Sequence, residues 1–393
     1  MNMKISPIAL TLTLAVAAVA APTALAFGPV PATARTRLPH SRSSASALFV
    51  SVSADTNVKV KSTATAQPLI MVDEDKEDSI SRPKVVRKPA SAEQMDVEDE
   101  AFFDNLPLGV KLTGADKLRA AGLNGKGVRV AVIDSGVDAD HTGFHGQVKQ
   151  QIWHRYGTPL SEDDHGTHVA GTIHMMAPEA EIYDYRVFGA EGNRIDISIA
   201  RSIRQAVEDG CDVINMSLGG PFANWEIGRA VQYAYENNVP MIVAAGNEGD
   251  DNILTNERSY PAMRPEVISI AAVGKYKGLP TAWFSNSNAQ VDYAGIGEDV
   301  HSFKPGGGLH QMSGTSMAAP HVCGLVAALM TEGGKYSDVI KHDASLREVL
   351  NEKYVRDIGV KGPDNETGLG FLTFLDESED DWFLGSDKAA LAP

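Results

Sequence analysis

The chain has 393 residues, of which 43% are apolar and 22% are charged, and its net charge is −16. This length and apolar content suit a soluble globular protein with a sizeable core, built as one large α/β domain or two ordinary ones. The negative charge argues against nucleic acid as a partner, because phosphate binding needs clustered Lys and Arg. The chain has only two cysteines, Cys211 and Cys323, so we expect buried free thiols and no disulfide framework.

The first 26 residues have the pattern of a signal peptide. Lys4 supplies a positive n-region, residues 8–21 an apolar h-region, and Ala24-Leu25-Ala26 a small-residue cleavage site. The apolar run is too short for a stable membrane anchor. Residues 27–50 contain arginines, many Ser, Thr and Ala, and no acidic residue, which resembles the two-part plastid-targeting leaders of algae with secondary plastids. We expect entry into the secretory route and an extracellular destination, with the plastid as the alternative.

The next boundaries follow from composition. Residues 51–103 carry Ser, Thr, Pro and mixed charge runs without a sustained apolar period, so they are predicted to be largely disordered. Together with the preceding stretch they make residues 27–103 a transit-like leader, a propeptide or a linker. Residues 104–375 are predicted to form one folded domain, and residues 376–393 an acidic tail in contact with solvent.

Strands and helices alternate along the predicted domain. In chain order we predict a helix near residues 115–121, strands at 128–133 and 181–187, an amphipathic helix at 196–209, a strand at 212–216, a helix at 225–237, strands at 241–245 and 267–273, and a buried helix over 322–330. Short apolar strands separated by helices indicate a parallel sheet covered on both faces. In such sheets, functional groups gather where strands end at their carboxyl edge.

Four polar residues occupy strand ends or helix starts in this pattern. Asp134 follows the strand at 128–133, His165 opens a run of small residues predicted to form a closely packed helix, Asn247 follows the strand at 241–245, and Ser316 precedes the buried helix. Asp134 and Asn247 taken alone could be ordinary turn formers, and Ser316 taken alone could be a helix cap. Together they supply the orienter, the general base, the oxyanion donor and the nucleophile of an acyl transfer.

Neighbouring residues have simpler interpretations. His165 and His168 are three positions apart and lack the Glu of the zinc-protease pattern His-Glu-x-x-His, so we predict no metal site here. His168 and His321 are expected to be structural histidines. Thr315, rather than Ser316, is the better candidate to cap the helix that follows.

These residues lie in longer motifs that together resemble the subtilisin-like serine proteases (subtilases, peptidase family S8). The motifs are Asp134-Ser135-Gly136, His165-Gly166-Thr167-His168-Val169-Ala170-Gly171-Thr172, Ser217-Leu218-Gly219, Ala245-Gly246-Asn247-Glu248-Gly249 and Gly314-Thr315-Ser316-Met317-Ala318-Ala319-Pro320-His321. The match covers about residues 106–335 in order. It implies a three-layer αβα sandwich on a mainly parallel sheet, and endopeptidase activity on polypeptides.

The resemblance also implies a role for each matched residue. Ser316 would be the nucleophile, His165 the general base and Asp134 its orienter, with Asn247 and the backbone N–H of Ser316 as the oxyanion hole. Two segments would hold the substrate backbone and a third would wall the specificity pocket, with an acidic residue at its rim that could favour basic side chains. These substrate-binding residues are Gly192, Asn193, Arg194, Ser217, Leu218, Gly219, Ala244, Ala245, Gly246 and Glu248.

Some features depart from the family or leave alternatives open. Where secreted bacterial members carry an Asn-rich insertion that helps to hold calcium, residues 173–176 pass straight to Ala177-Pro178, so we expect no tight calcium site and leave a weaker one open. No other cofactor is expected, and the protein is expected to be a monomer. Two alternatives to an endopeptidase remain: a catalytically silent subtilisin-like binding protein, and a peptide ligase or macrocyclase that uses the same acyl-enzyme.

Overall fold

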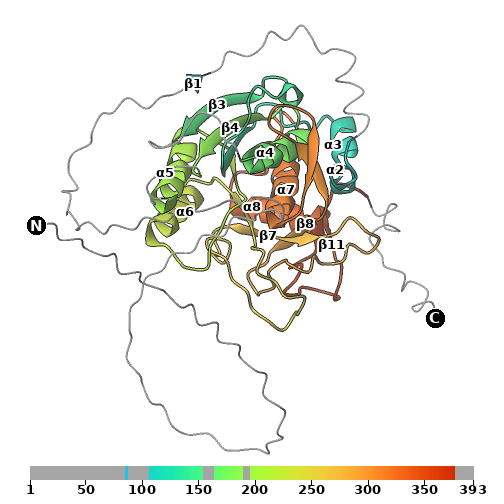
Figure 1. Ribbon diagram of the computed structural model, residues 1–393. Helices are drawn as coiled ribbons and strands as arrows, with labels where there is room; N and C mark the ends of the chain where they lie inside the picture. Colours follow the sequence, from blue (N-terminus) through green and yellow to red (C-terminus); the bar gives the residue numbers. More distant parts are fainter. Residues whose placement is uncertain (1–84, 87–105, 154–162, 189–194, 377–393) are drawn as a thin grey trace, which may run out of the picture. The chain divides into compact units, whose positions relative to one another are not determined.

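The computed structural model describes residues 85–86, 106–153, 163–188 and 195–376 (Figure 1). The predicted signal peptide (1–26) and most of the predicted leader or linker (27–103) lie outside these residues. The acidic tail beyond Asp376 does so too. The proposed domain boundaries therefore remain predictions.

Ten strands of the described residues form one sheet, in the order β1-β3-β4-β2-β5-β6-β7-β8-β12-β11. The pairs from β3 to β12 are parallel, whereas β1 and β11 pair antiparallel at the two edges. A separate antiparallel hairpin joins β9 and β10. The strands are β1 (Val85–Val86), β2 (Arg129–Asp134), β3 (Val148–Trp153), β4 (Glu181–Arg186), β5 (Val213–Met216), β6 (Met241–Ala244), β7 (Ile268–Val273), β8 (Tyr293–Ile296), β9 (Val300–Phe303), β10 (Leu309–Met312), β11 (Val355–Arg356) and β12 (Phe371–Leu372).

Helices cover both faces of this sheet, as the continuous apolar strands predict. Those of the described residues are α2 (Leu108–Thr113), α3 (Ala115–Ala120), the short 3₁₀ helix η1 (Thr142–Phe144), α4 (His165–Met176), α5 (Ile195–Glu208), α6 (Trp225–Glu236), α7 (Thr315–Leu329) and α8 (Asp343–Lys353). One hydrophobic core includes α4 and α7, and a second includes α5 and α6, which lie side by side in Figure 1. The predicted three-layer αβα sandwich on a mainly parallel sheet is confirmed.

Most predicted elements are confirmed to within one residue at each end, including the strand at 128–133 and the helix at 196–209. The predicted start of the helix at 322–330 was wrong, because α7 begins at Thr315 and contains Pro320. Ser316 is therefore the second residue of the helix, inside its first turn. The elements β1, β3, β8 to β12, η1, α2 and α8 were not predicted.

The connections of the sheet place a crevice beside β2. After β2 the chain adds β3 and β4 on one side and then crosses to β5 on the other side, so that β2 lies between β4 and β5. In open α/β sheets, ligands bind outside the carboxyl ends of the strands at such a switch point. The carboxyl ends of β2, β5 and β6 are therefore where a site is expected.

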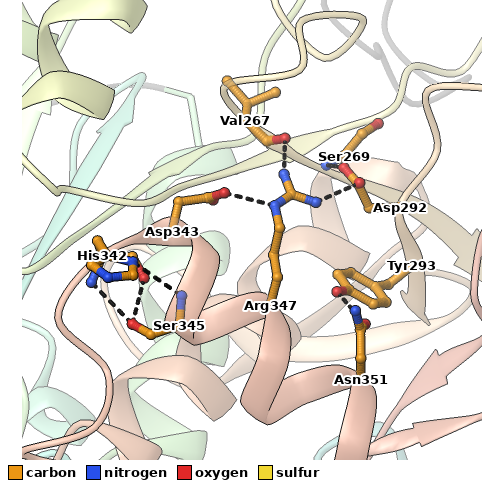
Figure 2. Close-up of polar contacts among 9 residues, drawn as sticks. All are labelled: Val267, Ser269, Asp292, Tyr293, His342, Asp343, Ser345, Arg347 and Asn351. Atoms are coloured by element: carbon orange, nitrogen blue, oxygen red, sulfur yellow. Dashed lines mark hydrogen bonds and ion pairs between the residues drawn. The ribbon is translucent and has the colours of Figure 1, made fainter.

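The last long helix, α8, is fastened to the sheet by one arginine (Figure 2). Arg347 donates to Asp343 Oδ2 at 2.7 Å, to Asp292 Oδ1 at 2.5 Å and to the carbonyl oxygen of Val267 at 2.6 Å. Asp292 also accepts the backbone N–H of Ser269 on β7 at 2.8 Å. The guanidinium thus joins the first turn of α8 to the region around β7 and β8.

Candidate active site

The carboxyl ends of β2, β5 and β6 and the first turns of α4 and α7 surround one cleft. Asp134 ends β2, Ser217 follows β5, and Asn247 lies three residues after β6. The cleft is lined by Asp134, Ser135, Asp163, His165, Phe188, Ser217, Leu218, Gly219, Ala244, Gly246, Asn247, Glu248, Ser259, Thr315 and Ser316. The fold therefore brings together all four residues that the sequence assigned to acyl transfer.

Asp134 and His165 form a buried pair. Nδ1 of His165 lies 2.8 Å from Oδ1 of Asp134, and because a carboxylate oxygen can only accept, Nδ1 carries the proton. The backbone N–H of Ser135 donates to the same oxygen at 2.6 Å. Asp134 is completely buried and His165 is 8% exposed. This arrangement leaves Nε2 of a neutral His165 with a free lone pair, as a general base requires.

The charges around His165 favour its protonated form. Burial by itself lowers the pKa of the imidazole, but the Asp134 carboxylate, its hydrogen bond, and the charges of Asp163 and Asp164 outweigh that effect. The net result is a pKa of His165 above its ordinary value of 6.5. Asp163 also accepts the backbone N–H of His165 at 2.9 Å, at the start of α4.

The strand that carries Asp134 and the helix that carries His165 touch through small residues. Gly136 has a φ of +110°, which favours glycine, and a β-carbon on Gly166 would collide with the carbonyl oxygen of Gly136. The hydroxyl of Ser135 accepts the backbone N–H of Gly166 at 3.0 Å. These small residues allow the approach that places His165 over Asp134.

Ser316 is held at the start of α7 by Ser217. Pro320 has no N–H and so cannot donate to the carbonyl of Ser316 four residues earlier, as a helix would normally require. The hydroxyl of Ser217 donates to that carbonyl oxygen instead, at 2.8 Å. The hydroxyl of Ser316 donates to the carbonyl oxygen of Ser217 at 3.2 Å, and no hydrogen bond with His165 is present among the described residues.

Asn247 is oriented by Thr315. Its Oδ1 accepts the backbone N–H of Thr315 at 2.8 Å and the hydroxyl of Thr315 at 2.9 Å. The oxygen is thus occupied on the α7 side, which leaves the Nδ2 donor for the cleft. The expectation that Thr315 caps α7 was wrong, because Gly314 holds the cap position and no side chain caps the helix.

The structure places six of the ten predicted substrate-binding residues at the cleft. Ser217, Leu218, Gly219, Ala244, Gly246 and Glu248 line the cleft, whereas Ala245 is buried and does not line it. The segment Gly192, Asn193 and Arg194 lies outside the described residues. The carboxylate of Glu248 accepts Nδ2 of Asn286 at 2.8 Å, and Oδ1 of Asn286 accepts the backbone N–H of Glu248 at 2.7 Å.

Several lining residues were missed from the sequence. Asp163 stands two positions before His165 and could have been found from that spacing. Phe188 and Ser259 have no local signal, because only the folded chain brings them to the cleft. Ser259 packs so closely on Gly219 that a β-carbon on Gly219 would collide with its hydroxyl.

The expected structural histidines are buried. His168 contacts the carbonyl oxygen of Val300 through Nε2 at 3.0 Å, and His321 contacts that of Met317 through Nδ1 at 2.8 Å. Burial lowers the pKa of His168 to about 3 and that of His321 to about 4.

In the described part of the chain, no three His, Cys, Asp or Glu side chains are grouped to hold a metal ion. No described helix is long and apolar enough to span a membrane.

Comparison with known proteins points to one family. A family model described as the subtilase family (Peptidase_S8) matches residues 125–370. The major intracellular serine protease of Bacillus subtilis (strain 168) is 37% identical over 306 residues, which is 72% of this chain and 93% of the relative. Subtilisin E of the same organism is 33% identical over 241 residues, or 59% of this chain and 62% of the relative. Two solved structures, Sphericase and the S41 psychrophilic protease, have TM-scores of 0.55 and 0.54 at 29% identity, each covering 64% of this chain and 93% of its own.

Proposed function

This chain belongs to the subtilase family and is a serine endopeptidase, and we propose that it cleaves polypeptides through an acyl-enzyme on Ser316. The observation that carries the proposal is the 2.8 Å contact between His165 and Asp134 in the cleft that Ser316 lines. The pair leaves Nε2 of His165 as a base in the same cleft as a hydroxyl nucleophile.

In the proposed reaction, the hydroxyl of Ser316 turns from the Ser217 carbonyl toward Nε2 of His165. Oγ attacks the carbonyl carbon of the scissile bond while its proton moves to Nε2. The carbon–nitrogen bond then breaks, and His165 returns the proton to the leaving amine. Water, activated by the same base, releases the acyl group and restores Ser316. Asp134 keeps His165 in the productive tautomer and stabilises the imidazolium.

Charge that develops on the substrate oxygen requires donors. We assign these to Nδ2 of Asn247 and the backbone N–H of Ser316, at the positive end of the α7 dipole. The support for this assignment is the double hydrogen bond from Thr315 that turns the amide oxygen of Asn247 away. Because the donors are held before substrate arrives, no reorganisation is needed at the moment of reaction.

Substrate is proposed to bind as an extended strand. The edge after β5, residues 217–219, offers backbone groups for β-strand addition, and the family resemblance would assign Gly192, Asn193 and Arg194 to the other side of the substrate. Ala244–Gly246 would wall the pocket for the side chain before the scissile bond. Glu248 would favour a basic side chain there, although its hydrogen bond to Asn286 competes with the substrate for one of its carboxylate oxygens.

We also propose a destination for the protein, the absence of a tight calcium requirement, and a monomeric state. We expect secretory entry through residues 1–26, and N-terminal sequencing of the mature protein would separate a secreted product from a plastid one and from a protein that keeps its leader. We expect activity to survive chelation of calcium by EDTA, and gel filtration to show a monomer. A loss of activity that calcium restores would identify the weaker calcium site.

The central test compares Ser316→Ala with Ser313→Ala, a matched change of an exposed serine three residues earlier. Ser316→Ala should abolish casein hydrolysis and labelling by a fluorophosphonate probe, while Ser313→Ala should retain both. Equal hydrolysis by the wild-type protein and Ser316→Ala would refute the mechanism. Probe labelling without hydrolysis would favour a ligase instead, and mass analysis of products with an added amine nucleophile would identify it.

A further inference from the structure

A second carboxyl group lies next to Asp134 and has no part in the proposed reaction. In the sheet, Asp184 of β4 is paired with Val132 of β2, two residues before Asp134. Side chains two apart on a strand share a face, and paired residues of parallel neighbours share a face as well. Asp184 and Asp134 therefore lie on the same face of adjacent strands, the face that α4 covers.

Asp184 holds the chain just beyond Asp134. Its Oδ2 accepts the backbone N–H of Val137 at 3.1 Å and Nε2 of Gln151 at 3.1 Å. Nε2 of Gln151 donates in addition to the carbonyl oxygen of Val137 at 2.8 Å. Asp184 and Gln151, which face each other across β4 and β3, thus bind both polar groups of the Val137 backbone.

The bound segment is the one that meets the helix of His165. Val137 follows Gly136, whose carbonyl oxygen packs directly against Gly166, the residue after His165. A shift of Val137 would move this contact and change the position of α4 relative to Asp134. The backbone of segment 135–137 is thereby tied to β3 and β4 on one side and to α4 on the other.

The other carboxyl oxygen of Asp184, Oδ1, is buried without a hydrogen bond among the described residues, and the side chain is 2% exposed. Burial raises the pKa of Asp184 to about 7, with the Asp134 charge adding to the rise, while the hydrogen bonds from Val137 and Gln151 and the charge of Arg186 oppose it. Both accepted bonds are on Oδ2, so Oδ1 is the oxygen that would carry the proton.

We propose that Asp184 is a positioning residue for the Asp134–His165 pair, acting through its hydrogen bond to Val137 and through its charge. The inference rests on the proposed function, since it concerns the same base. The charged groups that act on Asp184 are Asp134 on β2 and Arg186 on its own strand, and Asp134 is in turn hydrogen-bonded to His165 of α4. When Asp184 ionises, it adds a negative charge on this face and stabilises the imidazolium of His165.

Three variants separate the two effects. Asp184→Asn keeps an oxygen that can accept from Val137 and removes the charge. Asp184→Ala removes both. The matched control is Asp212→Asn. Asp212 is less buried than Asp184, but burial raises its pKa too, and it accepts a backbone N–H, from Arg129 at 2.7 Å, at the amino end of the sheet. Each substitution is made in the full chain. The proteins used to measure the pKa of His165 by NMR also carry Ser316→Ala, so that no autolysis occurs during the titration.

We expect Asp184→Asn to lower the pKa of His165 measured by NMR, and to move the acid limb of kcat/KM to lower pH. Asp184→Ala should in addition lower kcat by about tenfold with little change in KM, because the pair is misplaced rather than substrate binding weakened. Asp212→Asn should change neither the pKa nor kcat.

The proposal is wrong if the His165 pKa is the same in the wild-type, Asp184→Asn and Asp184→Ala proteins. It is also wrong if Asp184→Ala has the kcat of Asp184→Asn. The NMR titration needs no turnover, so it tests Asp184 even where the wild-type protein fails to hydrolyse peptides and the proposed function itself falls. If Asp184→Ala does not fold, Asp184→Asn and its His165 pKa decide the matter.

Discussion

Ser217 and Ser316, 99 residues apart in the chain, exchange two hydrogen bonds: each hydroxyl donates to the other residue's backbone carbonyl oxygen, at 2.8 Å and 3.2 Å. The first bond replaces the helical bond that Pro320 cannot make. The second holds the Ser316 hydroxyl until a base competes for its proton. One contact therefore stabilises the first turn of α7 and places the proposed nucleophile.

Ser217→Ala should destabilise the protein and slow it. Removal of the donor leaves a buried carbonyl unpaired, which costs about 1–3 kcal/mol in the free energy of unfolding. Because the start of α7 loosens, kcat should fall while KM changes little. Ser202→Ala on α5 is the matched control, since its buried hydroxyl has no hydrogen-bond partner in the described part of the chain. Equal unfolding free energies for the two variants, measured by urea denaturation in a Ser316→Ala background, would contradict this account.

Thr315→Val should slow the reaction without weakening substrate binding. Valine keeps the shape and the backbone N–H but removes the hydroxyl that donates to Asn247, so the amide is less well oriented. We expect kcat to fall by about tenfold or less, the worth of roughly one hydrogen bond, with KM unchanged. Asn247→Leu removes the donor itself, and the expected loss of about 100- to 1,000-fold is the known magnitude for subtilisin. A Thr315→Val enzyme with raised KM and unchanged kcat would point to a substrate-binding role instead.

The pH profile follows from the raised pKa of His165. The base must be neutral, so activity is full above this pKa and is lost as pH falls through it. The half-maximal point of kcat/KM should therefore lie above pH 6.5. Asp163→Asn removes one of the charges that raise the pKa, yet its amide oxygen can still accept the backbone N–H of His165. The acid limb should move to lower pH in this variant and stay in place in Asp116→Asn on α3.

Arg347→Met should strongly destabilise the domain without affecting the proposed site. The substitution leaves Asp292 and Asp343 without their shared cation (Figure 2), and loss of one partner from a largely buried ion pair costs about 3–5 kcal/mol. Lys341→Met is the control, because Lys341 pairs with Asp338 at the surface, where the two side chains are 58% and 100% exposed, and its loss should cost about 1 kcal/mol or less. Denaturation of both variants in a Ser316→Ala background measures the difference, and comparable losses would mean that the Arg347 network is no stronger than a surface pair.

Helical periodicity and continuous apolar runs in the sequence were enough to predict many of the helices and strands. Elements with a clear period, such as α5, or a continuous apolar run, such as β6, were found to within one residue because their signal lies within a single turn or strand. β8 and β12 are short, and β8 contains Gly295, so only pairing with neighbouring strands makes them strands. The start of α7 was misplaced because a proline normally marks the first turn or the end of a helix. Only the structure shows that the Ser217 hydroxyl replaces the hydrogen bond that Pro320 cannot donate to the Ser316 carbonyl.

For the site, the sequence by itself determined which residues are available: Asp134, His165, Asn247 and Ser316 stand at strand ends or helix starts, and a parallel sheet brings such ends to one edge. Only the tertiary structure decided how they are held. Thr315 orients Asn247 across 68 positions, Ser217 supports Ser316 across 99, and Asp184 binds the segment after Asp134 across 47. Hydrogen bonds over such separations depend on the packing of several strands and helices, and no local pattern in the chain encodes them.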